Sequence, residues 1–352
     1  MTRVFTLFFL VLLIHFSIPA AAQSTVRVGV LKHGTVNWEI DVIKHHQLDK
    51  KYNVDLTVTP LASKNSSAVA LQSNAVDIIL SDWLWVNRQR FDDKTYTMFP
   101  TSMATGGLYV AVDSGINTLA DFKGKKIGIA GGAVDKSWLL LQAYSQKKYN
   151  IDLKNDAQPT FAVPPLLNHL MLRGKLAGAI NFWHYGARLK AAGYQQLVTT
   201  SEMLNALGVN TEIPLLGWVF DEKWADKNSQ ALIGFLQASR EAKQILSRSD
   251  QEWQRIRALT KAENDEVFAM LKKDYRAGLL QQFAGKEKAA TKKVFNILAK
   301  QGGSALVGKA SALSDGTFWH TELLEKMLSG KAINDLDNVD GALKSDSLKV
   351  VQ

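Results

Sequence analysis

The sequence predicts an α/β protein built from two similar halves. Short apolar runs alternate with segments of helical spacing as far as about residue 220, which is typical of sheets flanked by helices. A strand–helix–strand unit also occurs twice, at 54–81 and 160–182, and tryptophan follows each copy, as Trp83 and as Trp183. Because ligands of open α/β sheets collect at the carboxyl ends of strands, both tryptophans mark a predicted site.

The first half begins with a strand in which valine dominates, followed by a polar loop with the sequence KHGTVN. The next helix carries apolar residues at helical spacing, and Asn74 tolerates the left-handed conformation that ends a helix. The expected elements are a strand at 26–31, a helix from about 36, a strand at 54–59, a helix at 66–73 and a strand at 76–81.

The second half repeats this order, and Gly174 is expected to end its second helix. The expected elements of this half are a strand at 126–130 with a helix to about 148, a strand at 160–163, a helix at 165–173 and a strand at 177–182. The segments 96–103 and 108–112 lie between the two halves, and a strand-like return run follows at 213–220. The rest of the chain is expected to be helical, at 231–246, 251–259, 266–281 and 288–300.

Residues 125–149, KKIGIAGGAVDKSWLLLQAYSQKKY, form the segment around which the chain is organised. A buried strand, a glycine turn and a helix start leave backbone N–H groups free, so an anion can bind there without a dedicated side chain. Asp135 or Ser137 is expected to cap the helix. The spacing fits neither a Walker A loop nor a GxGxxG dinucleotide motif, and the turn can also be a simple connection.

The composition is that of an ordinary globular protein, with 352 residues, 46% hydrophobic and 21% charged. The length allows two lobes with separate cores. The net charge of +9 is spread along the chain without a basic run, which argues against a nucleic-acid partner. Residues 105–215 carry the largest surplus, with 11 Lys and Arg against 7 Asp and Glu.

Residues 1–22 have the composition of a cleavable secretory signal peptide. Arg3 precedes an apolar run, and Ala20 and Ala22 stand before Gln23 in the pattern of a cleavage site. The run is too short to span a membrane, and no later segment approaches the length of one. The mature protein is therefore expected to be soluble in the periplasm, and lipid anchoring is excluded because no cysteine follows.

The chain has no cysteine, which removes disulfides, thiol nucleophiles and Cys-ligated metal sites. The adjacent His45 and His46 point about 100° apart on a helix, and no HxxxH or HExxH occurs. No metal and no cofactor are expected. No GxSxG occurs either, and no Ser-His-acid set follows from the spacing, so the chain is not expected to be an enzyme.

Several segments together resemble a known family. VDIILSDW, TGGLYVAV, LADFKGKKIGIAGGAVDKSWLLLQAY, LRGKLAGAINFWHYGARL and PLLGWVFDEKW occur in that order after the signal peptide. They resemble the periplasmic solute-binding proteins of ABC importers for nitrate, sulfonates, taurine and related solutes, over about residues 26–302. The most specific piece is LADFKGKKIGI, which stands where the second lobe of this family begins.

The resemblance implies a two-lobed periplasmic-binding-protein fold of type II, in which the chain crosses twice between the lobes at a hinge. Lobe 1 would comprise 24–104 plus 216–352, and lobe 2 would comprise 105–215. A small ligand would be held between the lobes of a monomer and delivered to an ABC importer permease in the inner membrane. The sequence departs from the family in two ways: the helix-start loop carries Asp135 and Lys136 where small hydroxyl residues are common, and the loops are unusually rich in tryptophan.

The positions of the family's pocket, carried onto this sequence, fall in the loops that follow the strands. Trp83 and Trp183 are the preferred contacts because they occupy equivalent places in the two halves, whereas Trp85 and Trp138 have core positions. Asp82 can cap a helix as well as meet a ligand, and His184 can donate to an oxyanion. The candidate residues are Gly34, Thr35, Trp38, Ser81, Asp82, Trp83, Thr105, Gly106, Gly132, Ala133, Asp135, Ser137, Asn181, Trp183, His184 and Trp218.

The expected solute is a small organic anion, sulfonate or taurine-like. Free helix-start N–H groups and a basic second lobe favour an anionic end, and paired tryptophans favour an apolar or planar body. Nitrate has no such body. A thiamine-pyrimidine precursor or another planar solute also fits, with Asp82 or Glu212 accepting its amino group. Two more functions are compatible with this fold, a receptor that presents its ligand to a membrane sensor and an enzyme.

Export and cleavage can be tested directly. The protein recovered from the periplasm should begin at Gln23 or at a neighbouring residue when its N-terminus is sequenced. A protein that keeps Met1 and stays in the membrane fraction would contradict the predicted signal peptide.

Overall fold

The computed structural model of the chain describes residues 24–319. The predicted signal peptide, 1–22, lies outside the described residues, as does the last part of the predicted first lobe, 320–352. No helix among the described residues has the length and the apolar character needed to cross a lipid bilayer.

The first of two sheets has five strands in the order β2-β1-β3-β10-β4. β1, β2 and β3 run parallel to one another, whereas β10 is antiparallel to both of its neighbours. The strands are β1 (Ser24–Leu31), β2 (Val54–Leu61), β3 (Ile78–Asp82), β4 (Tyr96–Ser102) and β10 (Leu216–Asp221).

The second sheet also has five strands, in the order β7-β6-β8-β5-β9. β6, β7 and β8 are parallel, and β5 is antiparallel to β8 and β9. The strands are β5 (Gly107–Ala111), β6 (Lys126–Ala130), β7 (Gln158–Ala162), β8 (Gly178–Asn181) and β9 (Tyr194–Thr199).

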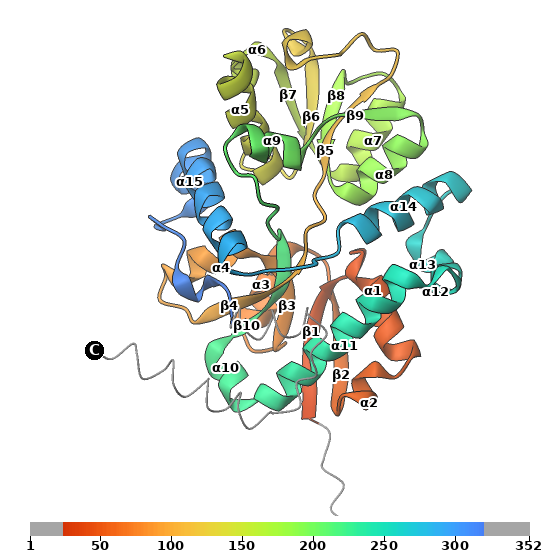
Figure 1. The fold of residues 1–352 in the computed structure, drawn as a ribbon, viewed down its shortest axis with the longest axis vertical. Coiled ribbons are helices and arrows are strands. Elements are labelled where there is room, and N and C mark those ends of the chain that lie inside the picture. Colours follow the sequence, from red (N-terminus) through yellow and green to blue (C-terminus); the bar gives the residue numbers. More distant parts are fainter. Residues whose placement is uncertain (1–23, 320–352) are drawn as a thin grey trace, which may run out of the picture.

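The two sheets are topologically equivalent, so the predicted repeat corresponds to a repeated fold. β1, β2 and β3 of the first sheet occupy the places of β6, β7 and β8 in the second, and β10 and β4 occupy those of β5 and β9. The central strands are buried along most of their length because helices cover them, which explains their apolar sequences. Figure 1 shows the two sheets one above the other along the long axis of the molecule.

The helices lie around the two sheets and at the waist between them. Those around the first sheet are α1 (Val36–His45), α2 (Leu48–Lys51), α3 (Lys64–Gln72), α4 (Trp83–Arg90), α10 (Glu222–Lys227), α11 (Ser229–Arg248), α12 (Asp250–Arg255) and α13 (Arg257–Thr260). Those around the second sheet are α5 (Lys136–Tyr149), α6 (Leu153–Asp156), α7 (Pro164–Leu172), α8 (Trp183–Ala191) and α9 (Thr200–Ala206).

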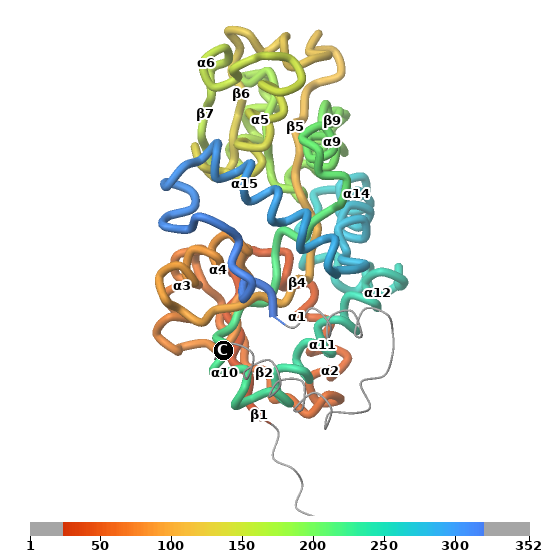
Figure 2. Tube along the Cα trace, turned by 60° about the vertical axis from the view of Figure 1, so that its left-hand side comes forward, coloured from red at the N-terminus to blue at the C-terminus, as the bar shows by residue number. Residues whose placement is uncertain are grey.

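Two C-terminal helices, α14 (Asp265–Ala277) and α15 (Gly285–Val307), lie on opposite sides of the waist (Figure 1). α14 packs on α8 of the second lobe, and α15 contacts both α5 of the second lobe and α4 of the first. Figure 2 shows α15 crossing the waist between the lobes. The C-terminal part of the chain therefore contacts both lobes.

The predicted helix ends are confirmed in the first two-thirds of the chain. Asn74 and Gly174 both have the left-handed conformation expected after a helix, with φ of 57° and 63°. Asp135, not Ser137, caps α5. The strand 194–199 was not predicted, because its sequence YQQLVT lies at a sheet edge and is mostly polar.

The C-terminal helix boundaries differ from the prediction. The helix expected at 266–281 ends at Ala277, because Gly278 follows it and packs against the backbone of Ala104. The helix expected at 251–259 is divided into α12 and α13. α15 begins three residues earlier than the predicted 288–300 and continues to Val307 only across a kink at Gly303, where the backbone is not helical.

The chain passes between the sheets in two segments, after β4 and before β10. Gly106 lies in the first segment, where a Cβ atom would be 1.7 Å from the carbonyl oxygen of Asn181. Only glycine allows this close approach of two backbones. The second segment is joined to the end of β4 by a hydrogen bond from the Leu215 N–H to the Ser102 carbonyl oxygen.

The substitution Gly106→Ala is expected to lower the free energy of unfolding by roughly 1–3 kcal/mol, the usual cost of overpacking. Urea denaturation followed by tryptophan fluorescence measures this change. Gly285→Ala is the matched control, because no atom lies within 4 Å of the added methyl group. An equal effect of both substitutions would contradict the close-approach argument.

Candidate functional site

A cavity of about 190 Å³ lies between the two lobes, where the strands of both sheets end. Its walls come from the segments that follow β1, β3, β6 and β8, which occupy equivalent places in the two sheets. We call it the cleft cavity. Its location is the one at which open α/β sheets bind ligands.

Nine of the sixteen candidate residues line the cleft cavity. They are Gly34, Thr35, Ser81, Asp82, Gly106, Asp135, Ser137, Trp183 and His184. Thr105 and Trp83 line a neighbouring cavity of about 200 Å³ beside the two crossing segments, which we call the crossover cavity. Trp38 lines a third cavity, which shares Gly34, Thr35 and His184 with the cleft cavity.

The other four candidates line none of these three cavities. Trp218 is buried in the first lobe, and its indole N–H donates to Ser239. Asn181 is buried and holds the carbonyl of Pro164 and the side chain of Asn168 in place. The remaining two, Gly132 and Ala133, lie in the turn before α5.

Trp83 and Trp183 follow equivalent strands, but their surroundings differ. Trp83 is only 1% exposed, and its indole N–H has no hydrogen-bond partner within residues 24–319. Trp183 is half-buried and lines both the cleft cavity and the crossover cavity. Of the two, Trp183 therefore has the larger surface available to a ligand.

An ion pair crosses the cleft cavity from one lobe to the other. The Lys136 Nζ atom, at the start of α5, lies 3.0 Å from Asp82 Oδ2, at the end of β3. Asp82 also caps α4 by accepting the N–H of Trp85. The Asp82 side chain is thus held by its own lobe and presented to the lysine of the other.

The charges at this site stabilise one another against burial. Burial opposes ionisation of Asp82, but the charges of Lys136 and Lys64 outweigh it and hold the pKa of Asp82 below its usual value. Burial likewise opposes the charge of Lys136, and the two carboxylates around it, Asp82 and Asp135, keep its pKa above the usual value. Both partners are therefore charged at neutral pH.

The prediction of free N–H groups at the start of α5 is wrong for two of them. The N–H groups of Ser137 and Trp138 donate to the carboxylate of Asp135, which places a negative charge at the positive end of the helix. Burial raises the pKa of Asp135 despite this bonding and the nearby Lys136. Positive charge for an anion must then come from side chains.

Two lysines line the cleft cavity although the sequence did not predict them as site residues. Lys136 stands out in the sequence only as a departure from the family pattern, and Lys64 does not stand out at all. Lys64 begins α3, the helix that follows β2, and its Nζ lies 5.8 Å from the ring centre of Phe182 in the other lobe. The sequence signal for Lys64 as a site residue was its position just after a parallel strand. A lysine that follows a serine N-cap is, however, usually an exposed surface residue, so the signal was not specific.

His184 is a neutral hydrogen-bonding group at the edge of the cleft cavity. Burial and the neighbouring charge of Arg188 lower its pKa to about 4. Its Nδ1 atom is buried without a partner among residues 24–319. A bare Nδ1 fits the tautomer that carries its proton on Nε2, and that N–H can donate to a ligand oxygen.

An aromatic cluster closes one side of the cleft. Trp183 of α8 meets Trp38 of α1 edge-on, with ring centres 5.9 Å apart, and Trp38 continues to Trp253 at 5.6 Å. Tyr275 of α14 contacts all three rings. Such edge-to-face contacts favour a fixed geometry of the rings. The rings come from four helices, α1, α8, α12 and α14, and the two lobes meet at this cluster.

Two further ion pairs join α8 to the segment after α13, one to the loop before α14 and one to α14 itself. Arg188 pairs with Glu263 at 2.9 Å, and Lys190 pairs with Asp274 at 2.6 Å. Within residues 24–319, no three His, Cys, Asp or Glu side chains gather closely enough to hold a metal ion.

Comparisons with solved structures identify the fold. The periplasmic aliphatic sulphonate-binding protein SsuA from Escherichia coli matches with a TM-score of 0.68 and 19% identity, over 85% of this chain and 92% of that chain. The alkanesulfonate-binding protein SsuA from Xanthomonas axonopodis, bound to MOPS, matches with a TM-score of 0.64 and 16% identity, over 85% and 99%. The chain therefore has the two-lobed fold of periplasmic binding proteins.

An enzyme shares this fold. The desulfurization enzyme DSZB matches with a TM-score of 0.57 and 12% identity, over 87% of this chain and 99% of that chain. At such identities the likeness concerns the fold alone, which is shared by binding proteins and an enzyme. Neither the protein-family models nor the curated protein sequences contain a match to this chain.

The buried, neutral His184 predicts a specific dependence of stability on pH. Folding lowers its pKa from about 6.5 to about 4, so the unfolded chain takes up the proton first as the pH falls. The free energy of unfolding should therefore decrease between pH 6.5 and 4, by at most about 1.4 kcal/mol per pH unit from this residue.

Urea denaturation at several pH values measures this effect. His184→Gln should reduce the slope in that window, while His33→Gln, at an exposed position, should keep the slope of the unchanged protein. Identical slopes for all three proteins would show that His184 is not buried in its neutral form.

Proposed function

We propose that this chain is an extracytoplasmic solute-binding protein that captures a small organic anion of the sulfonate type between its two lobes and delivers it to an ABC importer. The observation that carries the proposal is the cleft cavity, in which a lysine from each lobe, Lys64 and Lys136, meets an aromatic wall. The sulfonate-binding proteins with the same fold support the ligand class.

The charged groups suit an anionic headgroup that brings hydrogen-bond acceptors. Lys136 Nζ has three N–H donors and gives one of them to Asp82, so the others can meet sulfonate oxygens. Lys64 stands at the wall of the same cavity, and the Ser137 hydroxyl and His184 add neutral donors. A sulfonate has three acceptor oxygens in a tetrahedral arrangement and can meet several of these groups together.

The aromatic side chains suit the body of the ligand. The rings of Phe182 and Trp183 line the cavity beside the lysines, together with Leu80 and Leu216. Nitrate would leave this apolar surface uncovered, whereas an alkyl or aryl group would remove it from water at about 25 cal/mol per Å². An organic sulfonate therefore uses both the charged and the apolar parts of the cavity.

Capture requires that the lobes move relative to each other. We place the lobes at 24–104 plus 216–352 and at 105–215, with the hinge in the two crossing segments. Rotation about these segments would open the cleft cavity to solvent, as in other two-lobed binding proteins. The protein would act as a monomer in the periplasm, with the permease in the inner membrane as its partner.

A planar neutral solute, such as a thiamine-pyrimidine precursor, is the second candidate. Its amino group would need an acceptor, for which the sequence offers Asp82 and Glu212. Asp82 already accepts bonds from Trp85 and Lys136, and Glu212 lines the crossover cavity instead of the cleft cavity. Phe182 and Trp183 could still stack on a planar ring, so binding measurements must decide.

A sensor-coupled receptor and an enzyme would differ from the importer protein in what happens after binding. A receptor that presents its ligand to a membrane sensor would have the same cavity, and only its partner would distinguish it. An enzyme of this fold could not use a thiol, since the chain has no cysteine. The solute-binding role requires no group beyond those in the cavity.

Isothermal titration calorimetry on a ligand panel tests the proposal. The panel contains alkyl and aryl sulfonates, taurine, nitrate and hydroxymethylpyrimidine. A sulfonate is expected to bind with a micromolar or tighter constant, about −8 kcal/mol or beyond, and nitrate weakly. Tight binding of the pyrimidine without any sulfonate binding would refute the anion proposal.

Two substitutions relate the binding to the cavity. Trp183→Ala should weaken sulfonate binding by ~1–3 kcal/mol, the range found for aromatic stacking. Lys64→Met should weaken it by about 1 kcal/mol, as for a partly exposed ion pair. Lys147→Met, at the far end of α5, is the matched control and should bind as the unchanged protein does.

A further inference from the structure

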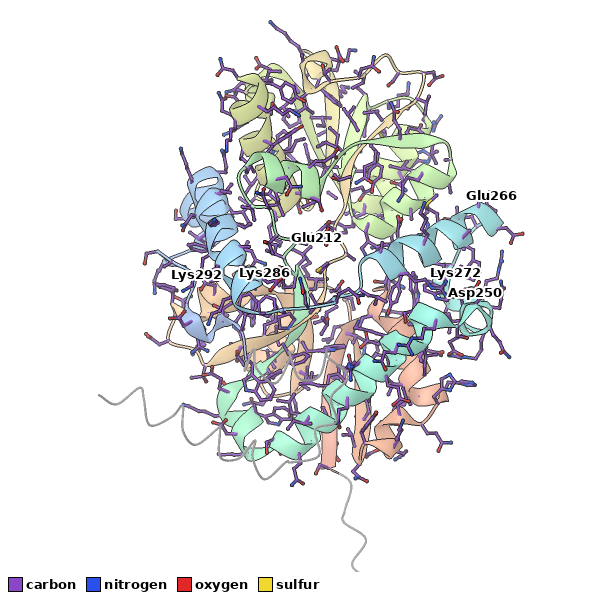
Figure 3. All side chains as sticks on the ribbon, in the orientation of Figure 1. Glu212, Asp250, Glu266, Lys272, Lys286 and Lys292 are labelled. Atoms are coloured by element: carbon purple, nitrogen blue, oxygen red, sulfur yellow. The ribbon has the colours of Figure 1, made fainter. Side chains whose placement is uncertain are left out.

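The crossover cavity adjoins the cleft cavity at the waist of the molecule. The two cavities share five lining residues, so the same side chains form the boundary between them. These are Ala104, Lys136, Ser137, Trp183 and Leu215. Figure 3 shows Glu212, which lines the crossover cavity, at the waist between the two sheets.

Of the five side chains at the boundary between the two cavities, those of Lys136, Trp183 and Leu215 are large, and the other two are small. Lys136 is bound to Asp82, and Trp183 packs edge-on against Trp38. Ala104 and Ser137 are short, and both are partly exposed. The boundary therefore leaves the most room beside Ala104 and Ser137.

The crossover cavity has an apolar side. Its lining includes Leu140 of α5, Leu204 of α9 and two residues of α15, Val294 and Leu298. The charged residues of its lining have partners: Lys190 bonds to Asp274 at 2.6 Å, Lys136 bonds to Asp82 at 3.0 Å, and Glu212 accepts the hydroxyl of Ser201 at 3.1 Å. An apolar chain placed here would be removed from water without leaving the Lys190–Asp274 ion pair broken.

We propose that the crossover cavity is a second subsite, which takes the apolar chain of an organic anion whose headgroup stays in the cleft cavity. The chain passes beside Ala104 and Ser137 and ends among the leucines of α9 and α15. The ligand class is thereby narrowed to sulfonates with a chain longer than the cleft cavity alone accommodates. This inference rests on the proposed function and specifies the ligand further.

A chain-length series tests the subsite. Calorimetry would compare ethane-, butane-, hexane-, octane- and decanesulfonate, which share one headgroup. Affinity should rise by about fourfold for each methylene that enters an apolar site. It should continue to rise beyond butanesulfonate and level off once both cavities are filled.

Substitutions that fill the crossover cavity should act on long ligands alone. Ala277→Phe, at an exposed position in its lining, is expected to reduce the affinity for octanesulfonate to that for butanesulfonate and to leave ethanesulfonate unchanged. Ser201→Phe fills the same cavity from α9 and replaces the first variant if that variant does not fold. Thermal melting of each variant shows whether it is folded. Ala192→Phe, exposed at the end of α8, is the control.

The outcomes separate the two proposals. An affinity that stops rising at butanesulfonate, or filling variants that weaken short and long ligands equally, would overturn the subsite while the sulfonate-binding function stands. Absence of binding by every sulfonate would overturn the proposed function and the subsite with it.

Discussion

The buried ion pair between Lys136 and Asp82 is the interaction on which the arrangement of the two lobes depends. Each charge stands at the start of a helix in a different lobe, and both are largely removed from water. A buried charge that loses its partner costs several kcal/mol. Pulling the two side chains apart is therefore unfavourable unless water enters and hydrates both charges. Separation of the lobes would thereby be coupled to hydration of the site.

The aromatic cluster and the two C-terminal helices complement this ion pair. Trp38 and Trp183 bring together one helix from each lobe, and Tyr275 adds α14 to the same contact. α15 contacts helices of both lobes on the other side of the waist. The lobes are thus joined by apolar and aromatic contacts at the sides and by the Lys136–Asp82 ion pair inside.

The repeat of the fold explains why the two halves offer similar but distinct groups. Equivalent strands end in Asp82 and Asn181, and the two side chains have different roles. Asp82 faces the cleft cavity and Lys136, whereas Asn181 is buried and bonded to Pro164 and Asn168. Likewise, Trp83 is buried under its lobe while Trp183 reaches the cavity. The repeated fold has therefore placed lysines of the cleft cavity on both sides and the open aromatic surface on one.

The sequence by itself determined the α/β class, the repeated strand–helix–strand unit and the loops that line the cleft, because periodicity and helix caps are local properties. Nine of the sixteen candidates that the family resemblance implied line the cleft cavity, because those positions fall in the loops that follow the strands. The sequence could not show that Asp135 occupies N–H groups of its own helix, or that Trp218 faces the core. The pairing of Lys136 with Asp82, 54 residues apart, was decided only by the tertiary structure, because no local pattern encodes the distance between two lobes.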